Sequence, residues 1–413
     1  MSKPTTGLKQ FLRDERGNFA MMFAIGIIPV ALSAGIAIDY SMASRYDSRL
    51  QAAVDAATLA AGVDLPKNTD AQVKKIVSAY LRANMENDDF AQLAGVPKIT
   101  IDRKTMKLTV EADGNMKTGL GGLVGIKKIN YGGIASIQAA WGGIEAVLVL
   151  DNTGSMAVDN KSAQLKIASK FFIDDMMALN KVETRVKVGI VPFAEYVNVG
   201  TNNGGASWLS LPAANSASPW IGCTGSRDRR LSLEDGSYNT LVPTVVGVAC
   251  PAEITPLTAD KTRLMNEADS MQTSGNTYIP AGIAWGLRVL SSQAPFTEAA
   301  TPVVQKRDNI TKAMIVMTDG ANTISKNPVT QYHDGTDVAQ ANSWTLQACA
   351  EVKKQNVKLF TVTFGAAVPR ATKDIIKACA SGTENYFDAD DGKQLKQAFT
   401  EISESLKRLY LTQ

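Results

Sequence analysis

The sequence predicts an α/β protein in three parts: an N-terminal transmembrane helix with a stem, a small α+β module, and a C-terminal doubly wound α/β domain. Three observations support this prediction. An uncharged apolar run near the N-terminus is long enough to span a bilayer, short alternating segments follow it, and strands then alternate with helices. We place the boundaries at residues 1–63, 64–142 and 143–413, with an insertion at about 195–260 in the last part.

The apolar run covers residues 19–38, and Pro29 within it would kink a spanning helix but not prevent it. Basic residues lie mainly on its N-terminal side, at Lys3, Lys9, Arg13 and Arg16. By the positive-inside tendency, the N-terminus is cytoplasmic and the rest of the chain is exported after a single pass. A cleaved signal peptide is the alternative, although its apolar core would cover only ~7–15 residues.

Behind the apolar run, small residues recur at helical spacing: Ala52, Ala53, Ala56, Ala57, Ala60 and Ala61. The helix is expected to continue out of the membrane with one small-residue face, which would allow close helix packing, although alanine also simply favours helix. The module after it is predicted from the periodicity as a helix at 70–81, a hairpin of 97–103 and 107–112 turned at Arg103-Lys104, a short helix at 118–124 and a strand at 129–140. It contains no catalytic grouping, and we interpret it as a spacer or docking layer.

The composition disfavours several classes of function. The 413 residues are 45% hydrophobic and 20% charged, and the net charge is +3 without a basic, aromatic-rich cluster, which argues against nucleic-acid binding. The only histidine is His333, so histidine-based triads, zinc sites and haem ligation are disfavoured. His333 lies in a polar turn, and we expect it on the surface.

The four cysteines form no CxxC pair, which argues against zinc ribbons and thioredoxin-like redox motifs. Buried thiols in a cytosolic protein are the alternative to two disulfides. Because the predicted anchor exports this part of the chain into an oxidising space, we predict disulfides. Three connectivities are possible, and we pair sequence neighbours: Cys223 with Cys250 and Cys349 with Cys379.

The N-terminal segment carries Arg16-Gly17-Asn18 before the apolar run, Asp39-Tyr40 after it, and Leu50-Gln51 with Asp55-Ala56-Ala57 in the stem helix. In these motifs it resembles the N-terminal segment of TadE/TadG-type Flp pilus-assembly proteins. Taken jointly with the resemblance of the C-terminal domain described below, it implies a TadG-like pilus-assembly component of a Gram-negative bacterium. Such a component would be anchored in the inner membrane through residues 19–38, with most of the chain periplasmic or facing the surface.

From residue 143 the alternation of strands and helices is typical of a sheet covered by helices on both faces. Strands are predicted at 146–150, 186–193, 311–317 and 358–363. Helices are predicted at 162–179, 259–271, 280–291, 336–355, 370–380 and 392–409. The turn-rich residues from about 195 to 260 depart from this pattern, and the insertion they form either takes part in ligand binding or serves as a covering flap.

Three segments rich in hydroxyls and acids lie at strand ends or in the loops of this domain. Asp151, Thr153 and Ser155 follow the first strand, Thr277 precedes a helix, and Asp319 follows a later strand. Ligands of such sheets bind outside the carboxyl ends of the strands. Two carboxylates and three hydroxyls form an oxygen-only set of low charge, which suits a hard cation such as Mg²⁺. Taken singly, each segment could instead be a helix cap or a turn.

Together the three segments resemble the metal-ion-dependent adhesion site of von Willebrand factor type A domains. The family motif is Asp-x-Ser-x-Ser with a distant threonine and a distant aspartate, which Asp151, Thr153, Ser155, Thr277 and Asp319 match with threonine in the middle position. The resemblance implies a Rossmann-like fold over about residues 145–409. It also implies that the three hydroxyls coordinate the ion directly while the acids act largely through water. The implied ion is divalent, Mg²⁺ in the first place, with Mn²⁺ and Ca²⁺ as alternatives.

The sequence therefore predicts a non-enzymatic, membrane-anchored adhesion or assembly component. Its cation would accept a carboxylate from a protein partner, which could be a pilus component, a neighbouring copy or a host surface. One alternative is a structural stalk with an empty metal site, in which the alanine-rich helix carries the assembly. The other is an exported metal-dependent hydrolase, which is disfavoured because no general base lies beside the hydroxyls apart from Asp151 and Asp319.

Overall fold

The computed structural model describes residues 16–63, 65, 68–85, 93–103, 105–138, 142–180, 184–211 and 218–412. The chain forms two compact units, residues 1–139 and residues 140–413. Among the residues that support the sequence predictions, Lys3, Lys9, Arg13 and Lys104 lie outside the described residues.

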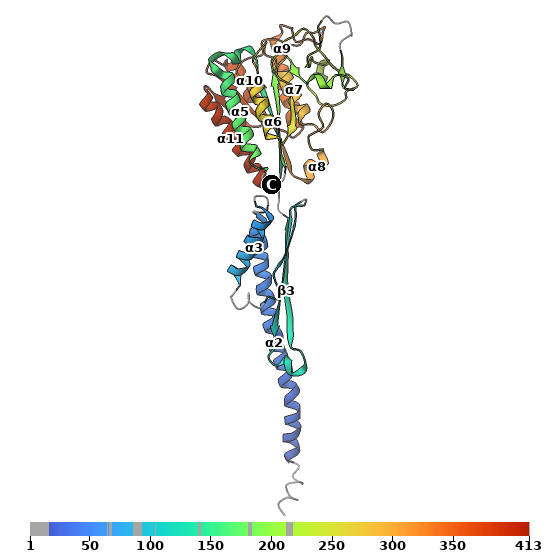
Figure 1. Ribbon diagram of the computed structural model, residues 1–413, viewed down its shortest axis with the longest axis vertical. Coiled ribbons are helices and arrows are strands. Elements are labelled where there is room, and N and C mark those ends of the chain that lie inside the picture. The colour runs from blue at the N-terminus through green and yellow to red at the C-terminus, as the bar shows by residue number, and fades with distance from the viewer. Residues whose placement is uncertain are drawn as a thin grey trace, which may run out of the picture. The chain divides into compact units, whose positions relative to one another are not determined.

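The first unit is built on one long helix, α2 (Arg16–Val63), which contains Pro29 and continues from the predicted span into the stem (Figure 1). Among the described residues, only this helix is long and apolar enough to be a candidate membrane span. Large apolar side chains are exposed along its first part: Met21, Met22, Phe23, Ile25, Ile27, Ile28, Val30 and Ile38. An exposed apolar surface of this kind suits a lipid environment.

Beyond the span, α2 packs on α3 (Asp70–Asn84) and on an antiparallel sheet of β1 (Lys98–Asp102), β2 (Lys107–Lys117) and β3 (Lys128–Gln138). The face of α2 that is buried consists mainly of small residues: Ala43, Leu50, Ala53, Val54, Ala57 and Ala61. Of the predicted small-residue face, Ala53, Ala57 and Ala61 are buried against the sheet and α3, whereas Ala52 is exposed. A Cβ added at Gly133 of β3 would stand only 3.1 Å from the Cα of Gln51.

Side chains of α2 also hydrogen-bond the edge of β3. The Gln51 amide donates from Nε2 to the Ile134 carbonyl and accepts the Ile134 N–H at Oε1, both at 3.1 Å. Asp47 accepts the N–H of Gly132 at 3.1 Å. Because an unpaired strand edge is a template for further pairing, these contacts satisfy backbone groups and cover the edge at the same time.

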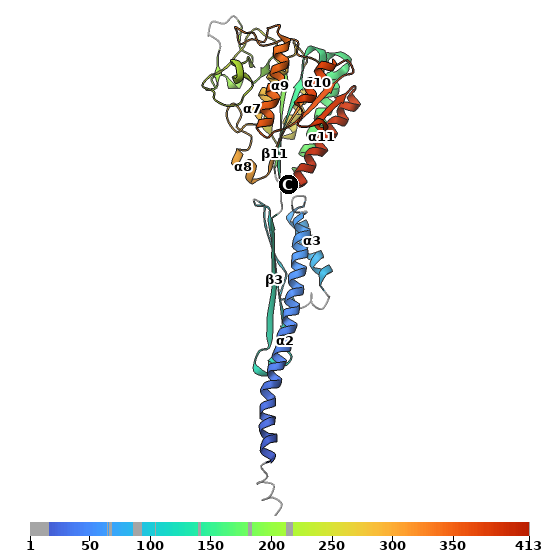
Figure 2. The same cartoon turned by 180° about the vertical axis from the view of Figure 1, so that it is seen from behind.

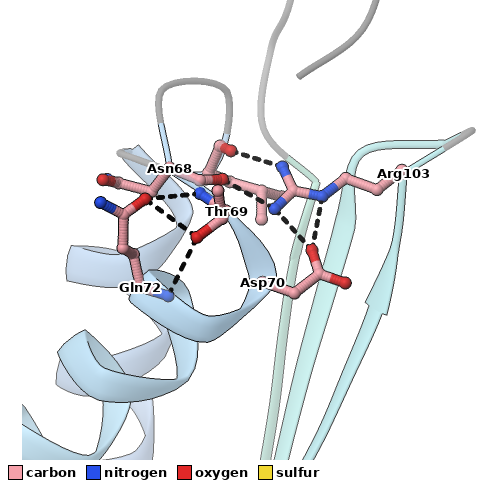
Figure 3. A network of polar contacts seen from close by, with 6 residues as sticks. Asn68, Thr69, Asp70, Gln72 and Arg103 are labelled. Atoms are coloured by element: carbon pink, nitrogen blue, oxygen red, sulfur yellow. Dashed lines mark hydrogen bonds and ion pairs between the residues drawn. The ribbon is translucent and has the colours of Figure 1, made fainter. Parts of the chain in front are cut away.

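A polar network joins the turn between β1 and β2 to the start of α3 (Figure 3). Thr69 caps α3 by accepting the Gln72 N–H at 3.4 Å, and the Gln72 side chain accepts the Thr69 N–H at 2.9 Å, which is a capping box. The guanidinium of Arg103, just after β1, donates to Asp70 at 2.6 Å and to the carbonyls of Leu65 and Asn68 at 2.6 and 2.8 Å. The connection between α2 and α3 is therefore held to the sheet.

The second unit contains an eight-stranded sheet in the order β13-β12-β11-β4-β5-β6-β8, with β10 also paired to β5. The parallel strands are β4 (Gly143–Asp151), β5 (Val186–Phe193), β11 (Ile310–Thr318), β12 (Lys358–Phe364) and β13 (Tyr386–Ala389). The antiparallel additions are β6 (Val197–Asn198), β8 (Cys223–Thr224) and β10 (Thr255–Thr258). Every residue of β4 is buried, as expected for a central strand covered on both faces.

Helices cover both faces of this sheet (Figures 1 and 2). The helices α5 (Lys161–Met177), α6 (Lys261–Ser270) and α11 (Gly392–Thr412) form one layer, and α7 (Ile279–Val289), α9 (Val338–Lys354) and α10 (Arg370–Cys379) form the other. The predicted α/β architecture is confirmed. Periodicity does not predict β13, the shorter strands or α8 (Pro302–Arg307), because segments of two to six residues carry little periodic signal.

The insertion between β5 and α6 continues the sheet. It contributes β6, β8 and β10, and a separate parallel pair of β7 (Leu209–Ser210) and β9 (Val242–Pro243), while residues 212–217 lie outside the described part of the chain. The Cys223–Cys250 disulfide joins β8 to the segment before β10, with 5.7 Å between the Cα atoms. The Cys349–Cys379 disulfide joins α9 to α10, with 5.2 Å between the Cα atoms. Both predicted pairings are present.

His333 is buried, so the expectation of a surface position is wrong. The residue is only 2% exposed, and its ring stacks on the ring of Tyr196 with 4.8 Å between the centroids. Nε2 hydrogen-bonds with the Ser226 hydroxyl at 2.7 Å, and Nδ1 meets the carbonyl oxygen of Glu195. Burial lowers the pKa of His333 from 6.5 to about 4. The polar residues around His333 predict an exposed turn. The insertion packs against this turn, and the local sequence contains no signal of that long-range contact.

Candidate metal site

The predicted site residues follow two adjacent strands. β4 and β11 pair in parallel with Leu150 opposite Met317, so Asp151 and Thr318 end their strands side by side. Asp151 is the last residue of β4, and Asp319 comes directly after β11. The two carboxylates therefore lie at the carboxyl edge of the sheet, which is where ligands of such sheets bind.

The carboxylate of Asp151 is fully buried and holds the first loop in shape. Its Oδ1 accepts the Thr153 N–H at 2.9 Å, and its Oδ2 accepts the hydroxyl of Thr318 at 2.6 Å. Both oxygens thus have protein partners, which suits an acid that acts on a cation through intervening groups rather than by direct contact. Thr318 is absent from the predicted ligand set, although it stands in the same Thr-Asp-Gly segment as Asp319.

The hydroxyls of Thr153 and Ser155 form the central pair of the site. Their oxygens lie 2.9 Å apart, and the Ser155 hydroxyl donates to Oδ1 of Asp319 at 2.6 Å. Mg²⁺ binds oxygen ligands octahedrally at about 2.1 Å, which places neighbouring ligand oxygens about 2.9 Å apart. The two hydroxyl oxygens are therefore already at the separation that neighbouring ligands of such an ion require.

Lys161 is a site residue that the motif does not predict. This first residue of α5 donates from Nζ to Oδ2 of Asp319 at 2.8 Å, and its side chain is only 16% exposed. The end of β12 makes room for it, since a Cβ added at Gly365 would stand 3.4 Å from Nζ. A lysine in the first turn of a helix is unfavourable for the helix dipole, and this exception is the only local signal of its role.

Backbone hydrogen bonds bring the segment that contains Thr277 against the first loop. The N–H of Gly154 donates to the Gly275 carbonyl at 3.0 Å, and the N–H of Ser274 donates to the Asn152 carbonyl at 2.9 Å. Glu195 supports the same turn by accepting the Asn276 N–H at 2.9 Å. Thr277 itself is 4% exposed and directly precedes Tyr278, the residue before α7.

A second chain of contacts links this segment to the Asp319 loop. The N–H of Thr277 donates to the hydroxyl of Thr323 at 2.8 Å, and the Thr323 N–H donates to the Thr277 carbonyl at 3.0 Å. All three predicted segments are thus joined by direct hydrogen bonds at one end of the sheet. The predicted ligands come from three loops that are distant in sequence. The hydrogen bond between Ser155 and Asp319 joins residues 164 positions apart.

The electrostatics of the site favour a cation. Burial, and after it the negative charge of Asp319, raises the pKa of the Asp151 carboxyl above its usual range. A divalent ion would relieve the repulsion between the two acids. Within the described residues, no group of three or more histidine, cysteine or acidic side chains could hold a metal, so a site here depends on hydroxyl ligands. The residues present fit a small, hard divalent ion and not a soft metal.

Two families match parts of the chain, one in each unit. The Flp pilus-assembly TadE/G-like family matches residues 17–64, and the von Willebrand factor type A domain family matches residues 249–401. The chain joins a TadE/G-like segment to a vWA domain. The first match covers most of α2, from the apolar span to the end of the stem helix, and associates the chain with pilus assembly. No curated protein matches the chain in sequence.

The vWA match covers only part of the candidate site. It includes Thr277 and Asp319, but it begins after the loop that carries Asp151, Thr153 and Ser155. The assignment of that loop therefore rests on its place in the vWA fold and on its hydrogen bonds to the matched part.

Several solved structures are similar to the chain. One is the vWF domain of the type V pili tip protein Mfa5 from Porphyromonas gingivalis, with 11% identity, a TM-score of 0.43, and coverage of 66% of this chain and 97% of that one. Another is the pilus adhesin SpaC from Lactobacillus rhamnosus GG, with 14% identity, a TM-score of 0.42, and coverage of 76% and 34%. A third is proximal thread matrix protein 1 from the mussel byssus with a zinc-occupied MIDAS motif, with 14% identity, a TM-score of 0.36, and coverage of 65% and 46%.

Proposed function

We propose that this protein is a membrane-anchored, non-enzymatic pilus-assembly or adhesion component whose vWA domain binds a protein partner through a divalent cation. The proposed ligand set is Asp151, Thr153, Ser155, Thr277 and Asp319. The observation that carries the proposal is the trio of oxygens from Thr153, Ser155 and Asp319, 2.9 and 2.6 Å apart, at the carboxyl edge of a vWA sheet.

In the proposed site, the hydroxyls and the acids have different roles. The hydroxyls of Thr153 and Ser155 would contact the ion, while Asp151 fixes the backbone of Thr153 and Asp319 holds the Ser155 hydroxyl. A bound Mg²⁺ or Mn²⁺ would supply a Lewis-acidic position for an acidic group of the partner. Because neutral hydroxyls neutralise little of the ion's charge, the ion would keep a strong attraction for a carboxylate.

The proposed location is the bacterial inner membrane, with α2 crossing once from a cytoplasmic N-terminus and the vWA domain in the periplasm or facing the surface. The apolar, exposed first part of α2 supports the anchor. The two disulfides support an oxidising space for the vWA domain. The partner is proposed to be another pilus-assembly component that offers an acidic side chain.

Titration of the full chain in detergent with Mn²⁺, followed by electron paramagnetic resonance, tests the metal site. We expect one bound ion, displaced by Mg²⁺, and loss of binding in Ser155→Ala. The matched control is Ser207→Ala, an exposed serine of the insertion, which should bind as the unaltered chain does. Equal binding by both variants, or none by the unaltered chain, would show that the site is not a metal site.

A structural stalk with an empty metal site is the second candidate, and Lys161 is the observation that favours it. Its ammonium group already neutralises Asp319 at 2.8 Å, so the fold does not require a metal for that charge. Retention of membrane partners by the immobilised full chain, compared with and without EDTA, separates the two functions. Partner binding that EDTA abolishes supports the adhesion site, and partner binding that EDTA leaves intact supports the stalk.

A further inference from the structure

The loop between β2 and β3 exposes an unusual amount of apolar surface. Residues 118–127 read TGLGGLVGIK, and a short 3-10 helix covers Gly121–Val124. Four large apolar side chains in this loop are exposed: Leu120 by 46%, Leu123 by 74%, Val124 by 46% and Ile126 by 45%. No described element of the stem covers them, and in water a patch of this kind marks an interaction surface.

The loop is fastened to α2 at the end of the apolar span. The carboxylate of Asp39 accepts the N–H groups of Gly119 at 3.0 Å and of Gly121 at 2.8 Å. The side chain of Leu120 lies against Gly35, where an added Cβ would approach it to 2.4 Å. Gly35 lies inside the apolar run of residues 19–38, so the loop reaches alongside the last turn of the span.

We propose that this loop, residues 118–127, inserts into the bilayer surface beside α2 and forms a second membrane contact of the stem. The proposal rests on the membrane anchor of the proposed function and commits to lipid as the occupant. Gly35 stands three residues before Ile38, about 4.5 Å along the helix axis inside the end of the span. Apolar groups of interfacial segments reach about 5–10 Å into the boundary between headgroups and acyl chains, which is slightly deeper than the level of Gly35.

The charges around the loop agree with a lipid surface. Lys117, Lys127 and Lys128 are exposed at the base of the loop, where β2 ends and β3 begins. The Asp39 carboxylate at the same level is buried against the loop backbone and does not face outward. Exposed lysines behind an apolar tip place cations among anionic headgroups while the apolar side chains enter the acyl region.

The contact between the loop and the bilayer would restrict the orientation of the stem relative to the membrane. Asp39 joins the loop to α2, and Gln51 joins β3 to α2 three turns further on. The hairpin of β2 and β3 is therefore hydrogen-bonded to α2 at two levels along the helix. With one helix alone, the stem could rotate about its axis and tilt, whereas a second inserted point restricts both motions.

Depth-dependent fluorescence on the full chain in vesicles of phosphatidylethanolamine and phosphatidylglycerol tests the proposal. Because the four native cysteines are disulfide-bonded, a new cysteine can be labelled singly with an environment-sensitive dye. The test position is Leu123→Cys. The buried-in-lipid control is Phe23→Cys within the span, and the aqueous control is Val63→Cys, an exposed position at the far end of α2.

We expect the dye at 123 to be blue-shifted and quenched by lipids with a nitroxide near the headgroup, and the dye at 63 to show neither effect. A dye at 123 that behaves like the dye at 63, while the dye at 23 is quenched, would overturn the inserted loop and leave the anchor intact. A dye at 23 that is not quenched would overturn the anchor as well. A blue shift at 123 without nitroxide quenching, lost when protein is diluted in lipid, would show that a second copy covers the loop.

A second measurement tests the role of the lysines. Quenching at position 123 should increase when phosphatidylglycerol is added to phosphatidylcholine vesicles. The double variant Lys127→Gln/Lys128→Gln should lose most of this increase, whereas Lys75→Gln/Lys107→Gln, two exposed lysines elsewhere in the stem unit, should retain it. No dependence on anionic lipid in the unaltered chain would contradict the proposed orientation of the loop.

Discussion

Asp39 in the stem and Asp151 in the vWA domain are both buried carboxylates at the end of an apolar segment, yet their surroundings differ. Asp39 accepts two backbone N–H groups from one loop and so holds that loop to the helix. Asp151 accepts one N–H and one hydroxyl, and the negative charge of Asp319 acts on it. The same residue type is a structural link where donors surround it and a candidate cation site where a second acid stands nearby.

Different contacts stabilise each of the two regions internally. In the stem, an uninterrupted helix covers a sheet edge through small residues and side-chain amides. In the vWA domain, a fully buried parallel strand, two disulfides and hydrogen bonds between loops fix the positions around the site. A rigid frame of this kind suits a binding site, because ligands for a small ion must be held in place before it arrives.

Acid should affect the vWA domain most strongly, because the chain's only histidine is buried there. The pKa of His333 is lowered from 6.5 to about 4, so the unfolded chain takes up a proton before the folded chain does. The stability that neutral His333 contributes is present above pH 6.5 and is lost as the pH falls towards 4, by about 3 kcal/mol. Urea unfolding followed by tryptophan fluorescence measures this, since all five tryptophans lie between residues 141 and 344.

The variant His333→Gln provides the reference for that measurement. The difference in unfolding free energy between the unaltered chain and this variant should shrink between pH 6.5 and 4. Carboxylates titrate in both proteins and cancel in the difference. A difference that stays constant with pH would mean that His333 is not held neutral by burial.

Replacing each aspartate by asparagine tests whether Asp151, unlike Asp39, contributes to a cation site. Asp151→Asn should weaken Mg²⁺ binding by about 10–100-fold, since groups that orient metal ligands typically contribute that much. Asp39→Asn is the matched control and should leave the affinity unchanged, because Asp39 belongs to the other unit. Isothermal calorimetry with Mg²⁺ on the detergent-solubilised chain measures both. Equal affinities in the two variants would mean that Asp151 contributes no more to metal binding than Asp39 does.

Lys161→Met should strengthen metal binding by a smaller factor. The ammonium group competes with a cation for Asp319, and an ion pair of this kind contributes about 1 kcal/mol, or about fivefold in affinity. The control is Lys170→Met on the same helix, whose ion pair with Asp269 lies at the surface. An affinity that falls in Lys161→Met and not in the control would mean that the lysine supports the site and does not compete for it.

The smallest expected effect is local and concerns the stem. Asp39→Asn removes one carboxylate oxygen that accepts an N–H, so the amides of Gly119 and Gly121 should exchange with deuterium faster. The amide of Ile134, which Gln51 holds independently, should exchange as before. Hydrogen exchange with mass spectrometry on the stem peptides measures both. Faster exchange throughout β3 would show that Asp39 supports the whole sheet and not the loop alone.

Sequence periodicity and strand ends predicted the framework of this protein. The apolar run and the alanine spacing determine α2, and the buried strands β4 and β11 are visible as apolar runs that end in Asp151 and Thr318. These features are local, because a helix or a central strand needs a pattern over only ten or so residues. The pairing of sequence-neighbour cysteines also follows the order of elements along the chain.

Tertiary structure alone decided the features that depend on distant segments. Lys161 reaches Asp319 across 158 positions in the sequence. The two-residue strand β6 forms by pairing with β5, and the two-residue strand β8 forms by pairing with β6. His333 is buried because the insertion packs against its turn, and Leu120 meets Gly35 because Asp39 holds the loop there. The sequence determines which residues can bind a cation or enter a membrane. Which of them are brought together depends on long-range packing, since no local pattern records which neighbour a side chain will meet in the fold.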